Sequence, residues 1–186
     1  CTVVPVVTPM IGMKSLGIKS VTIRTRQALS GAGCKLLFDA EALSGNVNPF
    51  IPQEEEKLIA ELKYLLGIDV PVIASCNRVS ERDGHFVSVG VELSRETTVE
   101  EVEELMKIPT LGLPSSPKLV NEIIDDSPTR QEYLWNGRGM TTTVGNIRVE
   151  GNIVRYDALS HNTVRGAAGG VILLAEFAVQ ESYITK

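Results

Sequence analysis

The stretch Ser75-Cys76-Asn77-Arg78-Val79-Ser80-Glu81-Arg82-Asp83-Gly84-His85-Phe86 joins two apolar runs near the middle of the chain. The run before it, residues 70–74, is short and rich in valine, and the run after it, residues 86–93, alternates apolar with small or polar residues. Such alternation predicts a half-buried strand, and an Asp-Gly pair is a turn signal. We therefore expect Arg78 and His85 at the ends of two neighbouring strands. A surface hairpin with a solvated charged tip is the alternative interpretation.

Length and composition are those of an ordinary globular domain. The 186 residues suffice for one domain with a sizeable core, and 43% hydrophobic with 22% charged residues is typical of soluble proteins. A net charge of -5 argues against nucleic acid or an anionic membrane as the main partner. No apolar run approaches the length of a membrane span, and the start of the chain lacks the basic region of a signal peptide.

Cysteine and histidine usage bears on compartment and metal binding. Three cysteines without close spacing fit a reducing compartment better than a disulfide framework, so we expect a cytoplasmic protein. His161, the second of two histidines, has no cysteine or histidine near it in sequence. We therefore expect no metal site.

The sequence begins with Cys1 rather than methionine, so we expect a processed product or part of a longer protein. A cysteine at the start of a helix meets the positive end of the helix dipole, which favours the thiolate. An N-terminal-nucleophile amidase, whose cysteine uses its own α-amine as base, is one enzyme class compatible with this position. A small buried hydrophobic residue is the alternative.

The first quarter of the chain predicts a helix, a strand and a loop. Residues 1–17 are apolar and end in glycine, which is typical of a helix, although Pro9 should kink or end it. Residues 18–26 alternate as a strand and lead into the small-residue loop 27–33, where a ligand could approach the backbone closely. An ordinary turn is the alternative for that loop. Residues 34–52 are expected to be irregular.

An acidic segment opens the next helix, whose apolar positions form one stripe: Leu58, Ile59, Leu62, Leu65 and Leu66. Glutamates in a first turn suit the helix dipole, which explains the acidic run without any function. Glu54 and Lys57 are three residues apart and share a face. Together they offer one anionic and one cationic contact to a zwitterionic or phosphorylated ligand.

The second half predicts further mixed structure. Thr98 and Glu101 form a capping box for a second amphipathic helix. Prolines mark residues 108–128 as a long surface connection, and two strands, 140–149 and 153–159, follow it. A glycine-rich segment then leads into an apolar helix that ends near Val179. The order of elements predicts an α+β domain with a largely antiparallel sheet.

Six blocks of sequence together resemble one enzyme family, the aspartate-semialdehyde dehydrogenases, in particular the C-terminal catalytic and dimerisation domain of their archaeal and fungal branch. The blocks occur in the family's order: Cys1-Thr2, residues 27–33, residues 54–57, residues 75–78 with 83–85, residues 162–169, and Gly139-Met140 with Val144-Gly145 and Ile147-Arg148. They span nearly the whole chain. Each block is weak alone, but their spacing makes the combination specific.

The resemblance implies a fold and a domain assignment. The fold is that of the C-terminal domain of glyceraldehyde-3-phosphate dehydrogenase, a mixed and mostly antiparallel sheet with helices on one face. Residues 1–186 would be one catalytic and dimerisation domain that starts at the nucleophilic cysteine. Because no Gly-x-Gly-x-x-Gly fingerprint occurs in the sequence, we expect the family's N-terminal dinucleotide-binding domain to be absent from this chain. The family also implies a homodimer or homotetramer.

The resemblance further implies NADPH-dependent reductive dephosphorylation of L-aspartyl 4-phosphate to L-aspartate 4-semialdehyde, a step in lysine, methionine and threonine biosynthesis. Cys1 matches the nucleophile that forms a thioacyl enzyme, and His85 matches the acid/base residue. Arg78 matches the contact to the substrate carboxylate, for which a planar guanidinium is suited. The remaining matches are Gln27 for the acyl intermediate, Glu54 for the substrate amine, Lys57 for the phosphate, and Ser30, Gly31 and Asn162 for the nicotinamide end of NADP.

Some features leave other functions open. Residues 33–37 replace the family's usual Gly-Tyr-Pro-Gly stretch, which changes the expected path of the loop. Malonyl- or succinyl-CoA reductases share the cysteine, arginine and histidine, but their substrates lack the amine that Glu54 would contact. A non-catalytic dimerisation module that retains these motifs is the second alternative.

Overall fold

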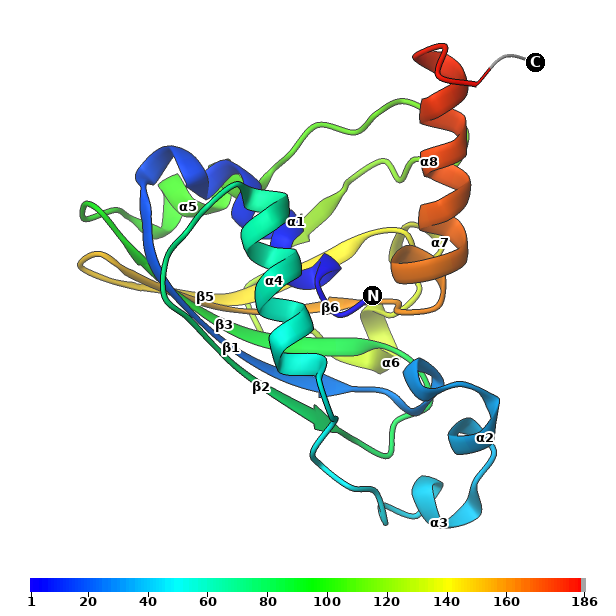
Figure 1. The fold of residues 1–186 in the computed structure, drawn as a ribbon. Helices are drawn as coiled ribbons and strands as arrows, with labels where there is room; N and C mark the ends of the chain where they lie inside the picture. Colours follow the sequence, from blue (N-terminus) through cyan, green and yellow to red (C-terminus); the bar gives the residue numbers. More distant parts are fainter. Residues whose placement is uncertain (185–186) are drawn as a thin grey trace.

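A mixed six-stranded sheet forms the body of the protein, whose computed structural model describes residues 1–184. The strand order is β2-β1-β3-β6-β5-β4 (Figure 1). The β1–β3, β3–β6 and β6–β5 pairs are antiparallel, and β1–β2 and β4–β5 are parallel. This confirms the α+β prediction. The strands are β1 (Ile18–Gln27), β2 (Val72–Arg78), β3 (His85–Leu93), β4 (Asn121–Ile123), β5 (Thr142–Glu150) and β6 (Ile153–Ser160).

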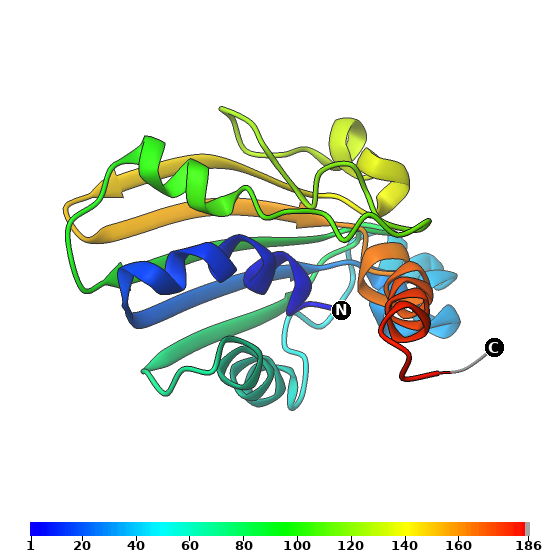
Figure 2. The same ribbon diagram turned by 90° about the horizontal axis from the view of Figure 1, so that it is seen from above.

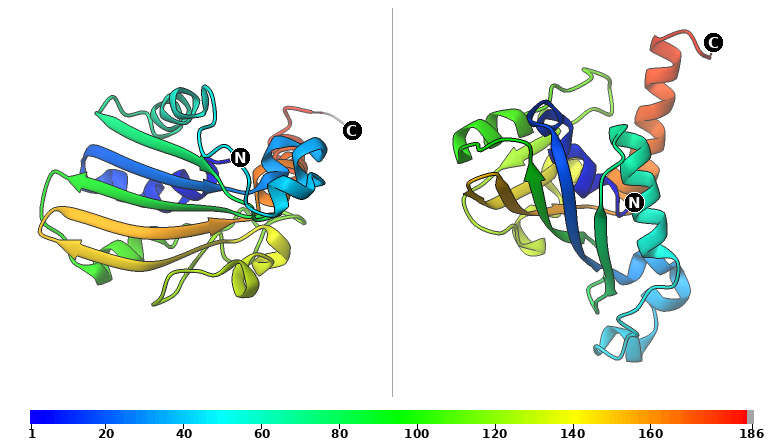
Figure 3. Two further views of the ribbon diagram at one scale, coloured as in Figure 1. Left: turned by 90° about the horizontal axis from the view of Figure 1, so that it is seen from below. Right: turned by 60° about the vertical axis from the view of Figure 1, so that its left-hand side comes forward.

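Three helices cover one face of the sheet: α1 (Val4–Met13), α4 (Glu54–Leu66) and α5 (Val99–Met106) (Figure 2). The opposite face is open over most of its length when seen from below, with the short helix α6 (Arg130–Tyr133) at one end of it (Figure 3). The helices bury their apolar stripes, so that Leu58, Leu62 and Leu66 of α4 are almost completely inaccessible. Such a stripe against the inner face of the sheet supplies the main hydrophobic stabilisation of the domain.

Helix α1 continues through Pro9, so of the two effects predicted for this proline, a kink or the end of the helix, the end does not occur. Pro9 has no N–H to donate, which leaves the Pro5 carbonyl without its intrahelical partner, at a cost of roughly 3 kcal/mol. Met10 and Met13, which follow the proline, are completely buried beneath the helix. Their burial offsets the cost. A short 3₁₀ turn, η1 (Lys14–Leu16), follows, and Gly17 ends it with a φ of 73°.

Arg78 and His85 do not lie on neighbouring strands, and the hairpin interpretation was also wrong. Strand β1 lies between β2 and β3. Helix α4 carries the chain from the end of β1 back to the start of β2, which makes these two strands parallel. Gln27 pairs with Arg78, and Arg26 pairs with Phe86. The end of β2 and the start of β3 therefore flank the end of β1 at one edge of the sheet.

Short elements gather around this edge and at the side of the sheet. Residues 34–52 were expected to be irregular, but their first part forms two short helices, α2 (Cys34–Leu37) and α3 (Ala40–Leu43). These follow the 3₁₀ turn η2 (Leu29–Ala32). Strand β4 lies in the 108–128 connection. The sequence did not predict it, because three residues without alternation show no strand pattern. The remaining elements are α6 (Arg130–Tyr133), α7 (Asn136–Gly139), the π-helix η3 (Val164–Ala168) and α8 (Gly169–Gln180), which projects away from the sheet (Figure 1). In residues 1–184 no helix combines the length and apolarity that a membrane crossing requires.

Candidate active site

A thiol and an imidazole meet where the sheet edge faces the start of α1. Cys1 Sγ lies 3.4 Å from His85 Nε2. Cys1 is half-buried, whereas His85, the first residue of β3, is completely buried. Gly166 packs against the cysteine, because a Cβ added to it would lie 2.6 Å from Cys1 Cβ. The structure therefore brings together the two residues predicted to carry the chemistry.

The main chain of Ala28 links His85 to Arg78. The Ala28 N–H donates to His85 Nδ1 at 3.1 Å, and Arg78 Nη1 donates to the Ala28 carbonyl at 2.7 Å. Burial lowers the pKa of Arg78, and Glu54 opposes this effect. Apart from the Nη1 bond, the guanidinium donors of Arg78 make no hydrogen bond within residues 1–184. Arg78 therefore stands beside the Cys1–His85 pair with donors available for an anionic group.

Glu54, at the start of α4, lies on the other side of the cysteine. Its Oε1 accepts hydrogen bonds from Thr2 Oγ1 at 2.9 Å and from Gln27 Nε2 at 3.3 Å. Lys57 is one turn along the helix, and its Nζ lies 3.8 Å from a carboxylate oxygen of Glu61 at the surface. Gln27 and Glu54 thus belong to one hydrogen-bonded group, and Lys57 lies at its outer margin.

The residues expected at the nicotinamide end form a second group beside His85. Asn162 Nδ2 donates to Ser30 Oγ at 2.8 Å, and Asn162 Oδ1 accepts from the Gly84 N–H at 2.8 Å. Gly31 lies directly against the imidazole, because a Cβ added there would be 2.9 Å from His85 Cε1. Only glycine fits this close approach of the η2 backbone to the ring.

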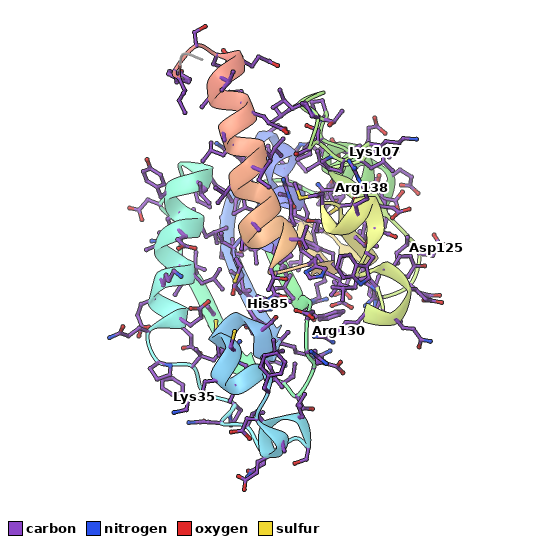
Figure 4. All side chains as sticks on the ribbon, turned by 90° about the vertical axis from the view of Figure 1, so that its right-hand side faces the viewer. Lys35, His85, Lys107, Asp125, Arg130 and Arg138 are labelled. Carbon is purple, nitrogen blue, oxygen red and sulfur yellow. The ribbon has the colours of Figure 1, made fainter. Side chains whose placement is uncertain are left out.

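Arg130 of α6 is a site residue that the sequence did not predict. Its Nε donates to the Gly84 carbonyl at 3.2 Å and its Nη2 donates to the Arg26 carbonyl at 3.2 Å. Both main-chain groups of Gly84 are therefore held, the N–H by Asn162 and the carbonyl by Arg130. Figure 4 shows Arg130 close to His85. This fixes the backbone immediately before His85. No local pattern marks Arg130, because the contact arises only when α6 folds back onto the sheet edge.

The electrostatic environment keeps the imidazole of His85 neutral. Its pKa is lowered from 6.5 to about 3, first by burial and then by the positive charges of Arg78 and Arg130. A hydrogen bond with the Gly84 backbone opposes this shift but does not outweigh it. At neutral pH the ring is therefore an uncharged hydrogen-bonding group.

Comparison with known proteins agrees with this fold. Residues 7–165 match the family model of the semialdehyde dehydrogenase dimerisation domain. An aspartate-semialdehyde dehydrogenase of Archaeoglobus fulgidus is 40% identical over 99% of this chain, and the chain spans 57% of that relative. A crystal structure of the aspartate-semialdehyde dehydrogenase of Candida albicans with NADP superposes with a TM-score of 0.79 and 29% identity, over 99% of this chain and 57% of that one.

A further relative is named malonyl CoA reductase (NADP), from Metallosphaera sedula. It is 30% identical over 91% of this chain and 53% of its own length. The chain thus spans little more than half the length of these relatives. The family match covers most of the sequence and includes strands β1 to β6 with helices α4 and α5. The chain belongs to the semialdehyde dehydrogenase dimerisation-domain family.

Proposed function

We propose that this chain is the catalytic and dimerisation portion of an enzyme that converts L-aspartyl 4-phosphate to L-aspartate 4-semialdehyde and phosphate with NADPH. The observation that carries the proposal is the 3.4 Å approach of Cys1 Sγ to His85 Nε2, with Arg78 beside it. A thiol, an imidazole and a guanidinium in one place suit covalent acyl transfer from an anionic substrate. The reaction serves lysine, methionine and threonine biosynthesis.

Cys1 is the proposed nucleophile. Its thiolate attacks the acyl carbon, a carbon–sulfur bond forms, and the carbon–oxygen bond to phosphate breaks, which leaves a thioacyl enzyme. His85 is the proposed hydrogen-bonding partner of the sulfur and of the acyl oxygen as negative charge develops on it. Gln27, at the end of β1, would help to orient the acyl group.

Three charged residues would bind the substrate. Arg78 would pair with the α-carboxylate through donors that make no hydrogen bond within residues 1–184. Glu54 uses Oε1 for Thr2 and Gln27, so its Oε2 would accept from the substrate amine. Lys57, exposed near the same end of α4, would contact the phosphate.

The nicotinamide end of NADP fits the surface formed by Ser30, Gly31 and Asn162. An added Cβ at Gly31 would strike the imidazole, so the bare backbone of this loop lies directly against His85 and keeps Ser30 close to the ring. Asn162 keeps one amide N–H beyond its bond to Ser30. When bound, the reduced cofactor supplies a hydride. Ser30 and Asn162 would hold its carboxamide end.

A dinucleotide-binding domain outside this chain would hold the rest of the cofactor. The relative from Candida albicans, whose structure contains NADP, is matched over only 57% of its chain. We further propose that two copies of the chain pair as a homodimer, or assemble as a homotetramer, through the open face of the sheet. The family model is described as a dimerisation domain.

The second candidate is reduction of malonyl- or succinyl-CoA. It is favoured by the relative named malonyl CoA reductase. Glu54 argues against it, because the Oε2 of its carboxylate makes no hydrogen bond within residues 1–184 and suits a substrate amine, which malonyl- and succinyl-CoA lack. A non-catalytic dimerisation module would need none of these contacts.

Turnover with two acyl donors separates these functions. A polypeptide that joins this chain to a dinucleotide-binding domain should oxidise NADPH with aspartyl phosphate and much more slowly with malonyl-CoA. Glu54→Gln, which keeps the shape and removes the charge, should reduce kcat/KM for aspartyl phosphate and leave that for malonyl-CoA unchanged or higher. Preference for the CoA thioester would refute the aspartyl assignment, and no turnover with either donor would favour the dimerisation module.

A further inference from the structure

The start of helix α4 is not held by a cap of its own. Gln53, the residue just before the helix, has a φ of 63°, in the left-handed region that a residue other than glycine adopts at a cost. Its side chain forms no capping hydrogen bond. Glu54, which the proposed function assigns to the substrate amine, is the next residue. The position of Glu54 therefore depends on contacts from outside the helix.

The three glutamates that open α4 make different contacts. Glu54 belongs to the hydrogen-bonded group around the cysteine. Glu55 is half-buried, and its Oε1 accepts a hydrogen bond from the Cys76 N–H of β2 at 3.0 Å. Glu56 is exposed and makes no hydrogen bond or ion pair in the part of the chain that the structure describes. The helix dipole favours all three charges alike, but it does not explain why one of them bonds to the sheet.

The N–H that Glu55 binds belongs to an edge strand. Strand β2 comes first in the strand order, and among the described strands it pairs only with β1. The outer edge of such a strand presents N–H groups without a strand partner. A carboxylate at this edge makes a charge-assisted hydrogen bond, which is stronger than a bond between neutral groups. Helix α4 packs against β2 (Figure 2), so the bond ties the first turn of the helix to the strand beside it.

The thiol of Cys76 is a second indication that the first turn of α4 lies close to β2. Burial raises the pKa of Cys76, and the negative charges of Glu54 and Glu55 raise it further. Both carboxylates therefore act on the same residue of the strand. Cys76 is itself almost completely buried and belongs to the hydrophobic core. The strand that anchors α4 is thus held firmly by its own packing.

The bond relates two residues that the proposed function places on the same substrate molecule. Cys76 lies two residues before Arg78 on β2, and Glu55 directly follows Glu54 on α4. Fixing Glu55 to Cys76 therefore fixes how far the Glu54 carboxylate lies from the Arg78 guanidinium. The α-amine and the α-carboxylate of an amino acid are attached to one carbon atom, so their two binding partners must keep one spacing. A misplacement of about 1 Å can cost roughly 100-fold in rate.

We propose that Glu55 is a positioning residue for recognition of the amino-acid part of the substrate, because its bond to the Cys76 N–H sets the spacing between Glu54 and Arg78. Glu55 acts through Glu54 and not by contact with the substrate. This role rests on the proposed function, which supplies the amine and the carboxylate. The anchor of α4 on β2 does not depend on that function.

Hydrogen exchange at the Cys76 amide tests the anchor without turnover. Glu55→Ala removes the acceptor, whereas Glu55→Gln keeps a side-chain oxygen that can accept. In NMR of nitrogen-labelled protein, exchange at Cys76 should be roughly tenfold or more faster for the alanine variant, as expected for loss of one hydrogen bond to a charged group. It should stay within a few-fold of wild type for the glutamine variant and for the control Glu56→Ala, which replaces the neighbouring exposed glutamate. Unchanged exchange in Glu55→Ala would overturn the proposal.

Two acyl donors that differ only in the amine test the effect on recognition. Succinyl phosphate is aspartyl phosphate without its amine. In a polypeptide that joins this chain to a dinucleotide-binding domain, Glu55→Ala should lower the ratio of kcat/KM for aspartyl phosphate to kcat/KM for succinyl phosphate by roughly tenfold. Glu55→Gln should restore the ratio to within a few-fold of wild type, and Glu56→Ala should leave it unchanged.

Three results would refute the role of Glu55 in recognition. A fall of equal size for both donors in Glu55→Ala would mean that Glu55 only supports the fold. A glutamine variant as poor as the alanine variant would mean that the hydrogen bond is not the cause. A wild-type ratio in Glu55→Ala, with wild type preferring aspartyl phosphate, would leave the proposed function intact and remove the role of Glu55.

The exchange measurement separates this proposal from the proposed function. If Glu55→Ala lost protection at Cys76 but wild type turned over neither donor, the aspartyl function would fail, and the role of Glu55 in recognition would fail with it. The anchor of α4 on β2 would stand.

Discussion

Replacement of His85 by glutamine should make folding less sensitive to acid. In the folded protein the pKa of His85 falls from 6.5 to about 3, chiefly because the ring is buried. A group whose pKa is lowered by folding is more easily protonated in the unfolded chain. Above about pH 6.5 the ring is neutral in both the folded and the unfolded state, so its ionisation does not change the free energy of unfolding. As the pH falls from about 6.5 toward about 3, protonation of the ring in the unfolded chain lowers that free energy.

The magnitude follows from linkage. Each unit of pKa difference is worth about 1.4 kcal/mol, so protonation of the unfolded chain costs the native state about 2 kcal/mol by about pH 5. The loss reaches about 4 kcal/mol at about pH 3 and levels off near about 5 kcal/mol at lower pH. Urea unfolding of wild type and His85→Gln at about pH 7.5 and about pH 5 measures it. Wild type should lose about 2 kcal/mol more than the variant between the two conditions.

The difference between the two pH values, rather than stability at either one, is the informative quantity. Glutamine changes packing at both pH values alike, and His161 and the carboxylates are present in both proteins. Their contributions therefore cancel in the comparison. An equal loss of stability in the two proteins would show that the ring is not held neutral, and the reasoning from burial would be refuted.

Three further changes test the packing and the site. Gly12→Ala would place a Cβ 1.9 Å from the Leu105 carbonyl, so urea unfolding should show a loss of about 2 kcal/mol or more, whereas the control Gly90→Ala, whose nearest contact would be 3.9 Å, should stay within about 1 kcal/mol. Arg78→Lys keeps the charge but loses the planar fork, so KM for the acyl substrate should rise roughly tenfold or more with a smaller effect on kcat. Arg130→Met removes the donors to the Gly84 and Arg26 carbonyls and should cost about 1–3 kcal/mol in the same unfolding assay.

For each of these three changes, one result would contradict the contact or role on which the prediction rests. Equal stability of the two glycine variants would mean that α1 and α5 are not in close contact. A loss in kcat alone for Arg78→Lys would assign the guanidinium to the chemical step rather than to binding. Arg130→Met with wild-type stability and an unchanged His85 NMR spectrum would show that the Gly84 carbonyl does not depend on Arg130.

Local pattern was sufficient to predict most of the elements. Alternation placed β1 and β3, and a turn signal placed β5 and β6, within about two residues of their observed ends, and apolar stripes placed α4 and α5. Helix α1 was predicted, but Pro9 does not end it. Burial of Met10 and Met13 in the core outweighs the local preference of proline. Strand β4 was missed because three residues are too few to show a period.

The order of the strands could not be read from local pattern. The turn signal between Arg78 and His85 predicted a hairpin, but β1 occupies the position between their strands because α4 returns the chain for parallel pairing. The two residues still meet one edge of the sheet. The candidate site therefore survived an error in topology, because it depends on which strand ends share an edge and not on which strands are adjacent.

The contacts that orient the site were hidden from the sequence for a different reason. The Ala28 amide carries no side-chain signal, and any residue other than proline would supply the same donor. Arg130 and Gly84 are joined by a contact between distant segments. Cys1, His85 and Arg78, by contrast, could be proposed from the sequence. The chemistry requires a thiol, an imidazole and a guanidinium, and the blocks that carry the family resemblance contain these residue types.

Acyl transfer to Cys1 can be measured without any cofactor. The protein is incubated with aspartyl phosphate, quenched in acid and digested, and the cysteine peptides are weighed by mass spectrometry. A thioacyl mechanism predicts an added aspartyl group on the Cys1 peptide, none on the peptides of the exposed Cys34 or the buried Cys76, and none at all in Cys1→Ala. An unmodified Cys1, or an adduct that persists in Cys1→Ala, would contradict the assignment of Cys1 as the nucleophile.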